Sequence, residues 1–159
     1  MKTVVVGIGT DFRGDDGAGL AAARALMKLA LPDVGIVELN GEVTRLLDSL
    51  QHCDTAIVID AVQSQVPPGT IHRLDASQNP LPGSRNKRST HGISLGSVLE
   101  LARAQGGFPR RVLIYGIEGA SFEHGRTLTP QVEKAVERLV QEIAEDLRDA
   151  GAVPSKRGE

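Results

Sequence analysis

The segment Gly7–Gly19 reads GIGTDFRGDDGAG and joins two stretches of opposite character. The β-branched run Thr3–Val6 precedes it, and an Ala- and Leu-rich stretch with helical spacing follows it. A strand, a glycine-rich loop and a helix in that order are typical of the opening of an α/β unit. In such units the loops that leave the carboxyl ends of the strands form the binding crevice. We therefore expect this loop to belong to the functional site.

The glycines of this loop suggest a dinucleotide-binding fingerprint, but their spacing and the nearby charges argue against one. Phe12 stands where the third glycine of such a fingerprint would be. Three acidic residues, Asp11, Asp15 and Asp16, surround the turn. A helix N-terminus that binds a diphosphate should not carry carboxylates beside it. Carboxylates at this place favour a cation.

The composition indicates one globular domain, which we place at residues 1–150. The chain has 159 residues, 40% of them hydrophobic, and a formal net charge of -2, which gives no electrostatic reason to bind nucleic acid. A single cysteine excludes an internal disulfide and fits a reducing compartment. No stretch is long enough to span a bilayer. We expect a cytoplasmic monomer that binds neither nucleic acid nor a membrane.

The hydrophobic pattern predicts a three-layer α/β/α sandwich around a mostly parallel five-stranded sheet of order 2-1-3-5-4. The predicted strands are Lys2–Ile8, Gly35–Leu39, Thr55–Ile59, Thr70–Leu74 and Arg111–Ile117. The predicted helices are Asp16–Ala30, Glu42–Leu50, Ile93–Gln105 and Pro130–Ala150. No helix separates the third and fourth strands, so we expect the fourth to lie antiparallel at an edge. The polar stretch Asp75–Thr90 is predicted to be a mobile surface loop, and residues 151–159, after a helix end at Gly151, a flexible tail.

Acidic residues follow the strands that should end at one edge of the sheet. Asp15 and Asp16 come after the first strand, Asp60 ends the third, and the loop 118–124 follows the fifth. An Asp at the end of a buried strand is costly without a cation or a hydrogen-bonding partner. The alternative is that Asp60 only caps the turn that follows. Asp15 and Asp16 are adjacent, so only one can face a shared site, and the other suits an N-cap.

His91 is the histidine best placed to join these carboxylates, because it ends the polar loop just before a helix. Two carboxylates and one imidazole can hold a borderline divalent metal and leave positions open for substrate or water. A solvated residue at the helix entry is the alternative interpretation of His91. We interpret Cys53 as an inert buried thiol at the opposite end of the third strand and His72 as a partly exposed edge residue. His124 and Glu123 follow the fifth strand, where contact with substrate is a further alternative.

Four groups of residues also resemble a known family in their order and spacing. They are Gly7-x-Gly9 with Arg13-Gly14-Asp15-Asp16-Gly17-x-Gly19, then Ile59-Asp60-Ala61, then Ser89-Thr90-His91, and finally Gly116-Ile117-Glu118 through Phe122-Glu123-x-Gly125 with Leu128-Thr129-Pro130. Over nearly its whole length the chain resembles the hydrogenase maturation proteases. These endopeptidases remove the C-terminal extension from the precursor of a NiFe-hydrogenase large subunit.

The resemblance implies a mixed five-stranded sheet and a nickel-dependent, aspartic-type endopeptidase that activates a hydrogenase. The family's metal-binding positions fall on Asp16, Asp60 and His91, which are thereby implied as the catalytic and metal-binding residues. The nickel belongs to the substrate, so the resemblance implies no permanently bound metal. The implied partner is the large-subunit precursor. Two places depart from the family pattern. Thr10 stands where Asn is usual, and Asn40-Gly41-Glu42 stands where the family usually has a Gly-Gly-Thr-like turn after the second strand.

Two other functions remain as alternatives. A receiver-like signalling domain also places acidic residues after the first strand and binds Mg²⁺. It needs a Lys at the end of the fifth strand, however, and Tyr115–Glu118 contains none. A metal-sensing or chaperone-like module without cleavage activity is the second alternative. The sequence contains no Gly-x-Ser-x-Gly elbow and no other obvious nucleophile, which leaves a metal-activated water as one possible reactant.

Overall fold

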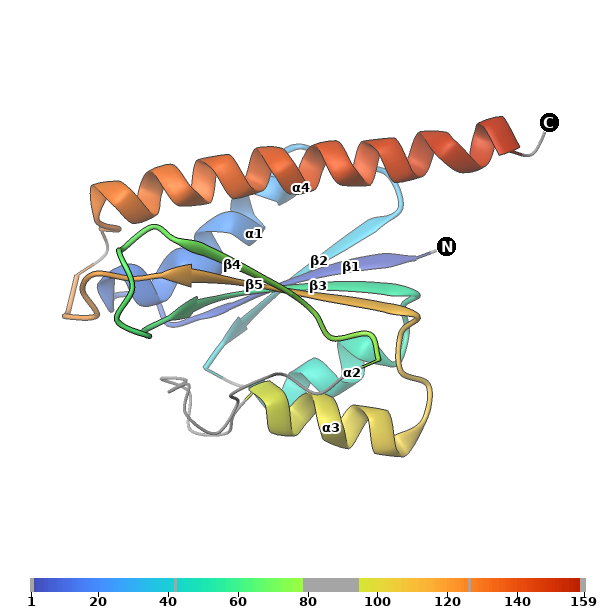
Figure 1. Ribbon diagram of the computed structural model, residues 1–159, viewed down its shortest axis with the longest axis horizontal. Helices are drawn as coiled ribbons and strands as arrows, with labels where there is room; N and C mark the ends of the chain where they lie inside the picture. The colour runs from blue at the N-terminus through green and yellow to red at the C-terminus, as the bar shows by residue number, and fades with distance from the viewer. Residues whose placement is uncertain (1, 42, 79–94, 126, 158–159) are drawn as a thin grey trace.

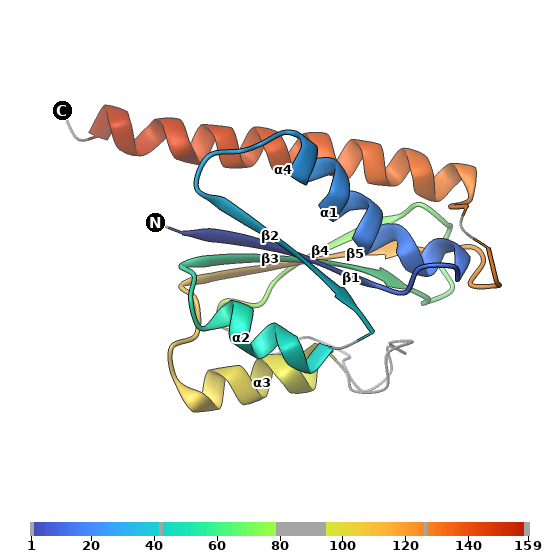
Figure 2. The same cartoon turned by 180° about the vertical axis from the view of Figure 1, so that it is seen from behind.

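A computed structural model describes residues 2–41, 43–78, 95–125 and 127–157 and arranges them in three layers (Figure 1). A sheet forms the middle layer. Helices α1 (Ala18–Lys28) and α4 (Pro130–Arg157) cover one face of the sheet. Helices α2 (Leu46–Leu50) and α3 (Leu95–Gln105) cover the other, and the view from behind shows the same division (Figure 2).

The sheet has the predicted strand order, β2-β1-β3-β5-β4. Its strands are β1 (Thr3–Gly9), β2 (Val34–Asn40), β3 (Thr55–Val62), β4 (Ile71–Asp75) and β5 (Arg111–Glu118). β4 pairs antiparallel with β5, and the other pairs are parallel. Two short 3-10 turns, η1 (Gly14–Gly17) and η2 (Val43–Arg45), precede α1 and α2. The predicted fold class, order and antiparallel edge strand are confirmed.

The core is divided into two clusters by the sheet, because successive side chains of a strand point to opposite faces. Along β3, Ile57 and Ile59 pack with α1 and α4, whereas Ala56 and Val58 pack with α2 and α3. The central strands are therefore apolar on both faces, as expected for parallel strands covered by helices. The buried stripe of α4 follows the predicted helical spacing and includes Val132, Val136, Leu139 and Ile143.

Several predicted helix boundaries are wrong. α1 ends at Lys28 rather than Ala30, and α2 begins at Leu46, after the 3-10 turn η2, rather than at Glu42. Asp16 lies in the 3-10 turn η1, and the α-helical part of α1 begins only at Ala18. α4 continues to Arg157 rather than ending at Ala150. A glycine such as Gly151 costs a helix only about 1 kcal/mol relative to alanine, so it need not end one. The flexibility of residues 151–159 stays a prediction.

Part of the predicted surface loop Asp75–Thr90 lies outside the described residues, which resume at Leu95. Asp75 ends β4 and binds Ser77, two residues further on, through its carboxylate. Within the described ranges, no helix has both the length and the apolar character needed to cross a membrane.

Candidate functional site

The sheet offers a crevice where β1 and β3 separate. β1 pairs with β3 only as far as Gly7, opposite Ile59, but continues along β2 as far as Gly9, opposite Asn40. β2 therefore lies on one side of β1 and β3 lies on the other, so the direction in which strands are added reverses at β1. Open α/β sheets bind ligands at such a topological switch point, outside the carboxyl ends of the strands. The loop after β1 and the last residues of β3 border it.

Asp60 lies on β3 at this switch point. The strand continues two residues beyond Asp60, so the prediction that Asp60 ends it is wrong: Asp60 to Val62 still pair with β5 after the pairing with β1 has stopped. Asp60 is only 6% exposed, and its Oδ1 accepts a hydrogen bond from the backbone N–H of Ala61 at 2.8 Å. Ala61 is itself a paired strand residue, so this bond is not the cap of a following turn that the alternative interpretation of Asp60 required.

Asp16 lies in η1 and is 1% exposed. η1 and β3 contain residue pairs with Cα atoms no more than 8 Å apart. The start of α1 approaches the sheet so closely that a Cβ on Gly19 would be 2.4 Å from the carbonyl oxygens of Ile8 and Ile59. Ile59 directly precedes Asp60. Asp16 and Asp60 therefore border the same switch point, and their action as metal ligands stays a prediction.

His91, the predicted third ligand, lies outside the described residues. Among the residues that are described, no three His, Cys, Asp or Glu side chains are grouped closely enough to hold a metal ion. A site built on Asp16 and Asp60 would therefore take further ligands from beyond these residues or from a bound partner. Glu42, one of the two departures from the family pattern, is also outside the described part of the chain.

Asp15 has a role of its own. Its side chain is fully buried, and Oδ2 accepts hydrogen bonds from Ala120 N at 2.7 Å, Ser121 N at 3.0 Å and Thr129 Oγ1 at 2.9 Å. Oδ1 accepts from Thr129 N at 2.8 Å. Thr129 directly precedes α4, so Asp15 caps a distant helix. The predicted N-cap on its own helix is wrong, because neither η1 nor α1 begins with a side-chain cap.

Asp11, the third acid of the loop, is paired with a cation. The Arg24 guanidinium donates to both carboxylate oxygens of Asp11, at 2.9 and 3.2 Å, and to Glu38 at 2.9 Å. The hydrogen bonds that Arg24 donates to Asp11 and Glu38 raise the pKa of its guanidinium. Of the three acids of this loop, Asp11 thus forms a surface ion pair, Asp15 links two loops, and Asp16 lies at the switch point.

Phe12 has an unusual backbone for a bulky residue, with φ at 69°. Its side chain is 53% exposed, and its carbonyl oxygen accepts a hydrogen bond from Gly125 N at 2.8 Å. Such backbone strain occurs often at functional sites. A cleft of about 340 Å³ lies beside it, lined by residues that include Asp11, Phe12, Ala21, Arg24 and Leu128. Its volume is within the range of small ligand sites.

Glu118 is a buried carboxylate that the sequence did not single out. It ends β5 and accepts hydrogen bonds from the backbone N–H and the hydroxyl of Ser64, in the chain that follows β3. His72 on β4 lies 3.1 Å from it through Nε2 and is 29% exposed, in agreement with its predicted edge position. These partners are 46 and 54 residues away in sequence, so no local pattern indicates them.

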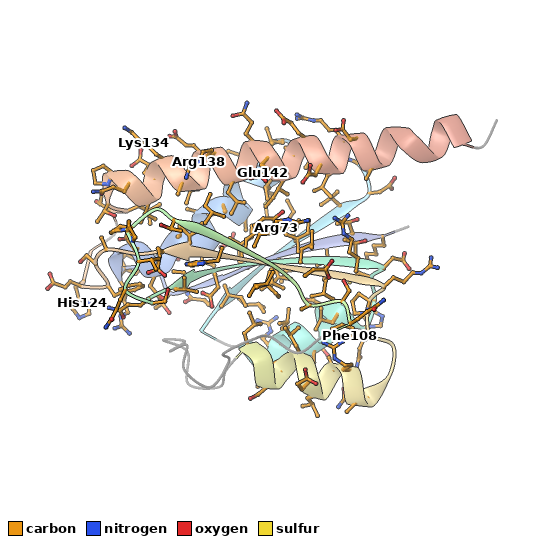
Figure 3. The ribbon with its side chains drawn as sticks, viewed as in Figure 1. Arg73, Phe108, His124, Lys134, Arg138 and Glu142 are labelled. Carbon is orange, nitrogen blue, oxygen red and sulfur yellow. The ribbon has the colours of Figure 1, made fainter. Side chains whose placement is uncertain are left out.

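The remaining candidates lie apart from the switch point or on its rim. Burial raises the pKa of the Cys53 thiol, as its interpretation as an inert residue requires. Cys53 precedes β3, at the end of the strand opposite Asp60. Glu123 and His124 are exposed on the loop between β5 and α4. Figure 3 shows His124 at the carboxyl end of the sheet. Their contact with substrate stays a prediction.

Comparisons with known proteins indicate the same family as the sequence resemblance. A family model described as hydrogenase maturation protease matches residues 21–146, a range that includes Asp60. The hydrogenase 2 maturation protease of Escherichia coli K12 is 31% identical over 159 residues, which span 97% of this chain and 96% of the relative. That alignment extends over nearly the whole chain and complements the family model, whose match begins after Asp16.

Solved structures agree with these sequence matches. The hydrogenase maturating endopeptidase HybD from Escherichia coli superposes with a TM-score of 0.82 at 28% identity, over 95% of this chain and 94% of that one. The NiFe hydrogenase maturation protease HybD from Thermococcus kodakarensis gives a TM-score of 0.75 at 26% identity, over 92% of this chain and 99% of that one. The likeness therefore extends over nearly the whole described fold.

Proposed function

The chain belongs to the hydrogenase maturation protease family and is a hydrogenase maturation endopeptidase, and we propose that it removes the C-terminal extension of a NiFe-hydrogenase large-subunit precursor after nickel insertion. In this proposal the precursor-borne nickel is recognised through Asp16, Asp60 and His91. The enzyme itself keeps no permanent metal. The receiver-like and non-cleaving alternatives have no support from the family match.

The observation that carries the proposal is the burial of two carboxylates at one switch point. Asp16 is 1% exposed and Asp60 is 6% exposed, and they come from the two chain segments that separate there. A buried carboxylate destabilises a protein unless a cation or hydrogen bonds offset its desolvation. A divalent cation held between them would interact favourably with both. Oxygen and imidazole ligands are suited to nickel.

Nickel carried by the precursor would let the enzyme test its own substrate. A nickel-loaded precursor offers coordination bonds as well as its peptide surface, whereas a nickel-free precursor offers only the peptide. The difference between these two binding free energies gives specificity for the metal-loaded form. The enzyme would then recognise the nickel itself, whose insertion must precede cleavage.

Cleavage of matched precursors with and without nickel tests this proposal. The protease is first treated with a chelator and freed of it, so that nickel can enter only with the precursor. We expect the nickel-loaded precursor to be cut at least about tenfold faster, since loss of one ordered metal interaction typically has effects of 10- to 100-fold. Equal cleavage of both precursors would refute nickel recognition.

The variant Asp60→Asn tests the residue assignment. It keeps the shape of the side chain and removes a charge that burial disfavours, so we expect a folded protein. Cleavage of the nickel-loaded precursor should fall at least about tenfold. Asp48→Asn makes the same change on the exposed side of α2 and should leave the rate unchanged. Full activity of Asp60→Asn would contradict the role given to this carboxylate.

A further inference from the structure

The loop that carries Asp16 is joined to the loop between β5 and α4 by backbone hydrogen bonds. Gly14 N donates to Gly125 O at 2.9 Å, and Gly125 N donates to Phe12 O at 2.8 Å. Asp15 N donates to Ser121 O at 2.8 Å. Two loops more than a hundred residues apart in sequence are thus held edge to edge, and we call this contact the loop seam.

The buried Asp15 carboxylate adds side-chain hydrogen bonds to the loop seam. Its two oxygens accept four hydrogen bonds, from Ala120 N, Ser121 N and both the backbone N–H and the hydroxyl of Thr129. An ionised carboxylate accepts without donating, which matches four donors. The amide of asparagine would bring an NH₂ group against at least one N–H or O–H. The donor set therefore specifies an acid.

The loop seam leaves no room for the loops to readjust. A Cβ on Gly14 would be 2.7 Å from Ser121 O, and Gly14 has φ at 56°. A Cβ on Gly119 would be 2.6 Å from Phe122 Cζ and 3.0 Å from the Cβ of Asp15. Backbones that approach this closely cannot slide past one another without a clash. A side chain at position 15 that repels these donors would therefore displace its own turn, because the neighbouring loop cannot move to relieve the repulsion.

Asp16 is the next residue of the same 3-10 turn, and its backbone is held from the other side by the end of β1. Asp16 O accepts from Thr10 N at 3.4 Å, and a Cβ on Gly9 would be 2.3 Å from that oxygen. We infer that Asp15 is a positioning residue, which sets the place of the Asp16 carboxylate for recognition of the precursor's nickel. This inference rests on the proposed function.

A positioning role and a merely structural role predict different kinetics. A variant that is only less stable has fewer folded molecules, so its maximal rate falls while its KM is unchanged. A variant with a displaced Asp16 still folds but binds the nickel-loaded precursor less well, so its KM rises. The same variant should also bind free Ni²⁺ less tightly in the absence of precursor.

The test compares four variants with the wild type. Asp15→Asn should raise the KM for the nickel-loaded precursor and weaken Ni²⁺ binding in calorimetry by about 10- to 100-fold each. Thr129→Ala, which removes one donor and keeps the acid, should move both values in the same direction by a smaller factor. Thr129→Ser keeps the hydroxyl and should have wild-type values of both. Ile143→Ala, on the buried face of α4, should lower thermal stability without changing KM.

An Asp15→Asn variant with wild-type KM and wild-type Ni²⁺ affinity would overturn the positioning role. If that variant does not fold, Thr129→Ala decides in its place, and unchanged values there would overturn the role equally. A wild-type enzyme that cuts both precursor forms alike would instead refute the proposed nickel recognition. The two failures are therefore distinguishable.

Discussion

Replacing Gly19 by alanine should show how closely α1 must approach the sheet to form the switch point. A Cβ at this position would be 2.4 Å from Ile8 O, 2.4 Å from Ile59 O and 3.0 Å from Ile8 N. Ordinary van der Waals contact begins at 3.4 Å, so the helix would have to move by about 1 Å. All three atoms belong to the backbone of paired strands and cannot rotate away.

The expected loss of stability follows from two opposed effects. Overpacking a well-packed contact typically costs about 1–3 kcal/mol, and two simultaneous backbone clashes place Gly19→Ala at the upper end. Alanine gains up to about 1 kcal/mol over glycine in a helix. The net destabilisation should be about 2 kcal/mol. For a domain of this size that corresponds to a fall in Tm of roughly 4–8 °C.

Gly17→Ala is the matched control for this prediction. A Cβ on Gly17 would have Thr10 O as its neighbour at 3.9 Å, and its φ of -83° suits any residue. Thermal melts followed by circular dichroism should give this control the Tm of the wild type within about 2 °C. Cleavage, measured where both variants are folded, should fall only for Gly19→Ala, because α1 carries η1 and Asp16 with it. Equal Tm values for the two variants would refute the argument from close approach.

Two further predictions concern Glu118, at the end of β5, and Asp75, at the end of β4. Glu118→Gln should lower the free energy of unfolding in urea by about 1–3 kcal/mol, because a neutral amide oxygen accepts weaker hydrogen bonds from Ser64 than a carboxylate does; an unchanged midpoint would contradict this. Hydrogen bonds from the Ser77 hydroxyl and N–H hold the pKa of Asp75 below its usual 3.8. Its stabilisation is therefore present above the unfolded pKa and lost as pH falls through the folded pKa. Ser77→Ala should raise the Asp75 pKa in an NMR titration, and an unmoved pKa would show that the hydroxyl is not the cause.

The switch point could be predicted from the sequence because it depends on topology. Strand and helix periods gave the sheet order, and parallel strands bring their carboxyl ends to one edge. The approach of η1, which contains Asp16, to β3 follows from that rule, although β3 begins 39 residues after Asp16. The end of β3 was predicted two residues early because a lone Asp resembles a strand terminus. The pairing of Asp60 with Gly116 on one side is a tertiary effect.

The loop seam could not be predicted in this way. Asp15 and Asp16 are identical neighbours, and nothing local tells which one turns toward the loop between β5 and α4. The choice is made by donors at Ala120, Ser121 and Thr129, whose distance along the chain leaves no periodic signal. The same holds for Glu118, whose partners come from the chain between β3 and β4 and from β4 itself.

Asp15 and Glu118 are buried carboxylates whose hydrogen-bond donors come from distant parts of the chain. Four hydrogen bonds offset the desolvation of Asp15, and Ser64 with His72 does so for Glu118. Asp15 fixes the turn that contains Asp16, and Glu118 fixes the chain at Ser64, shortly after Asp60. On the proposed function, the two recognising carboxylates are then in place before the precursor arrives. Binding would not have to order either loop, so more of the interaction free energy could distinguish nickel-loaded from nickel-free precursor.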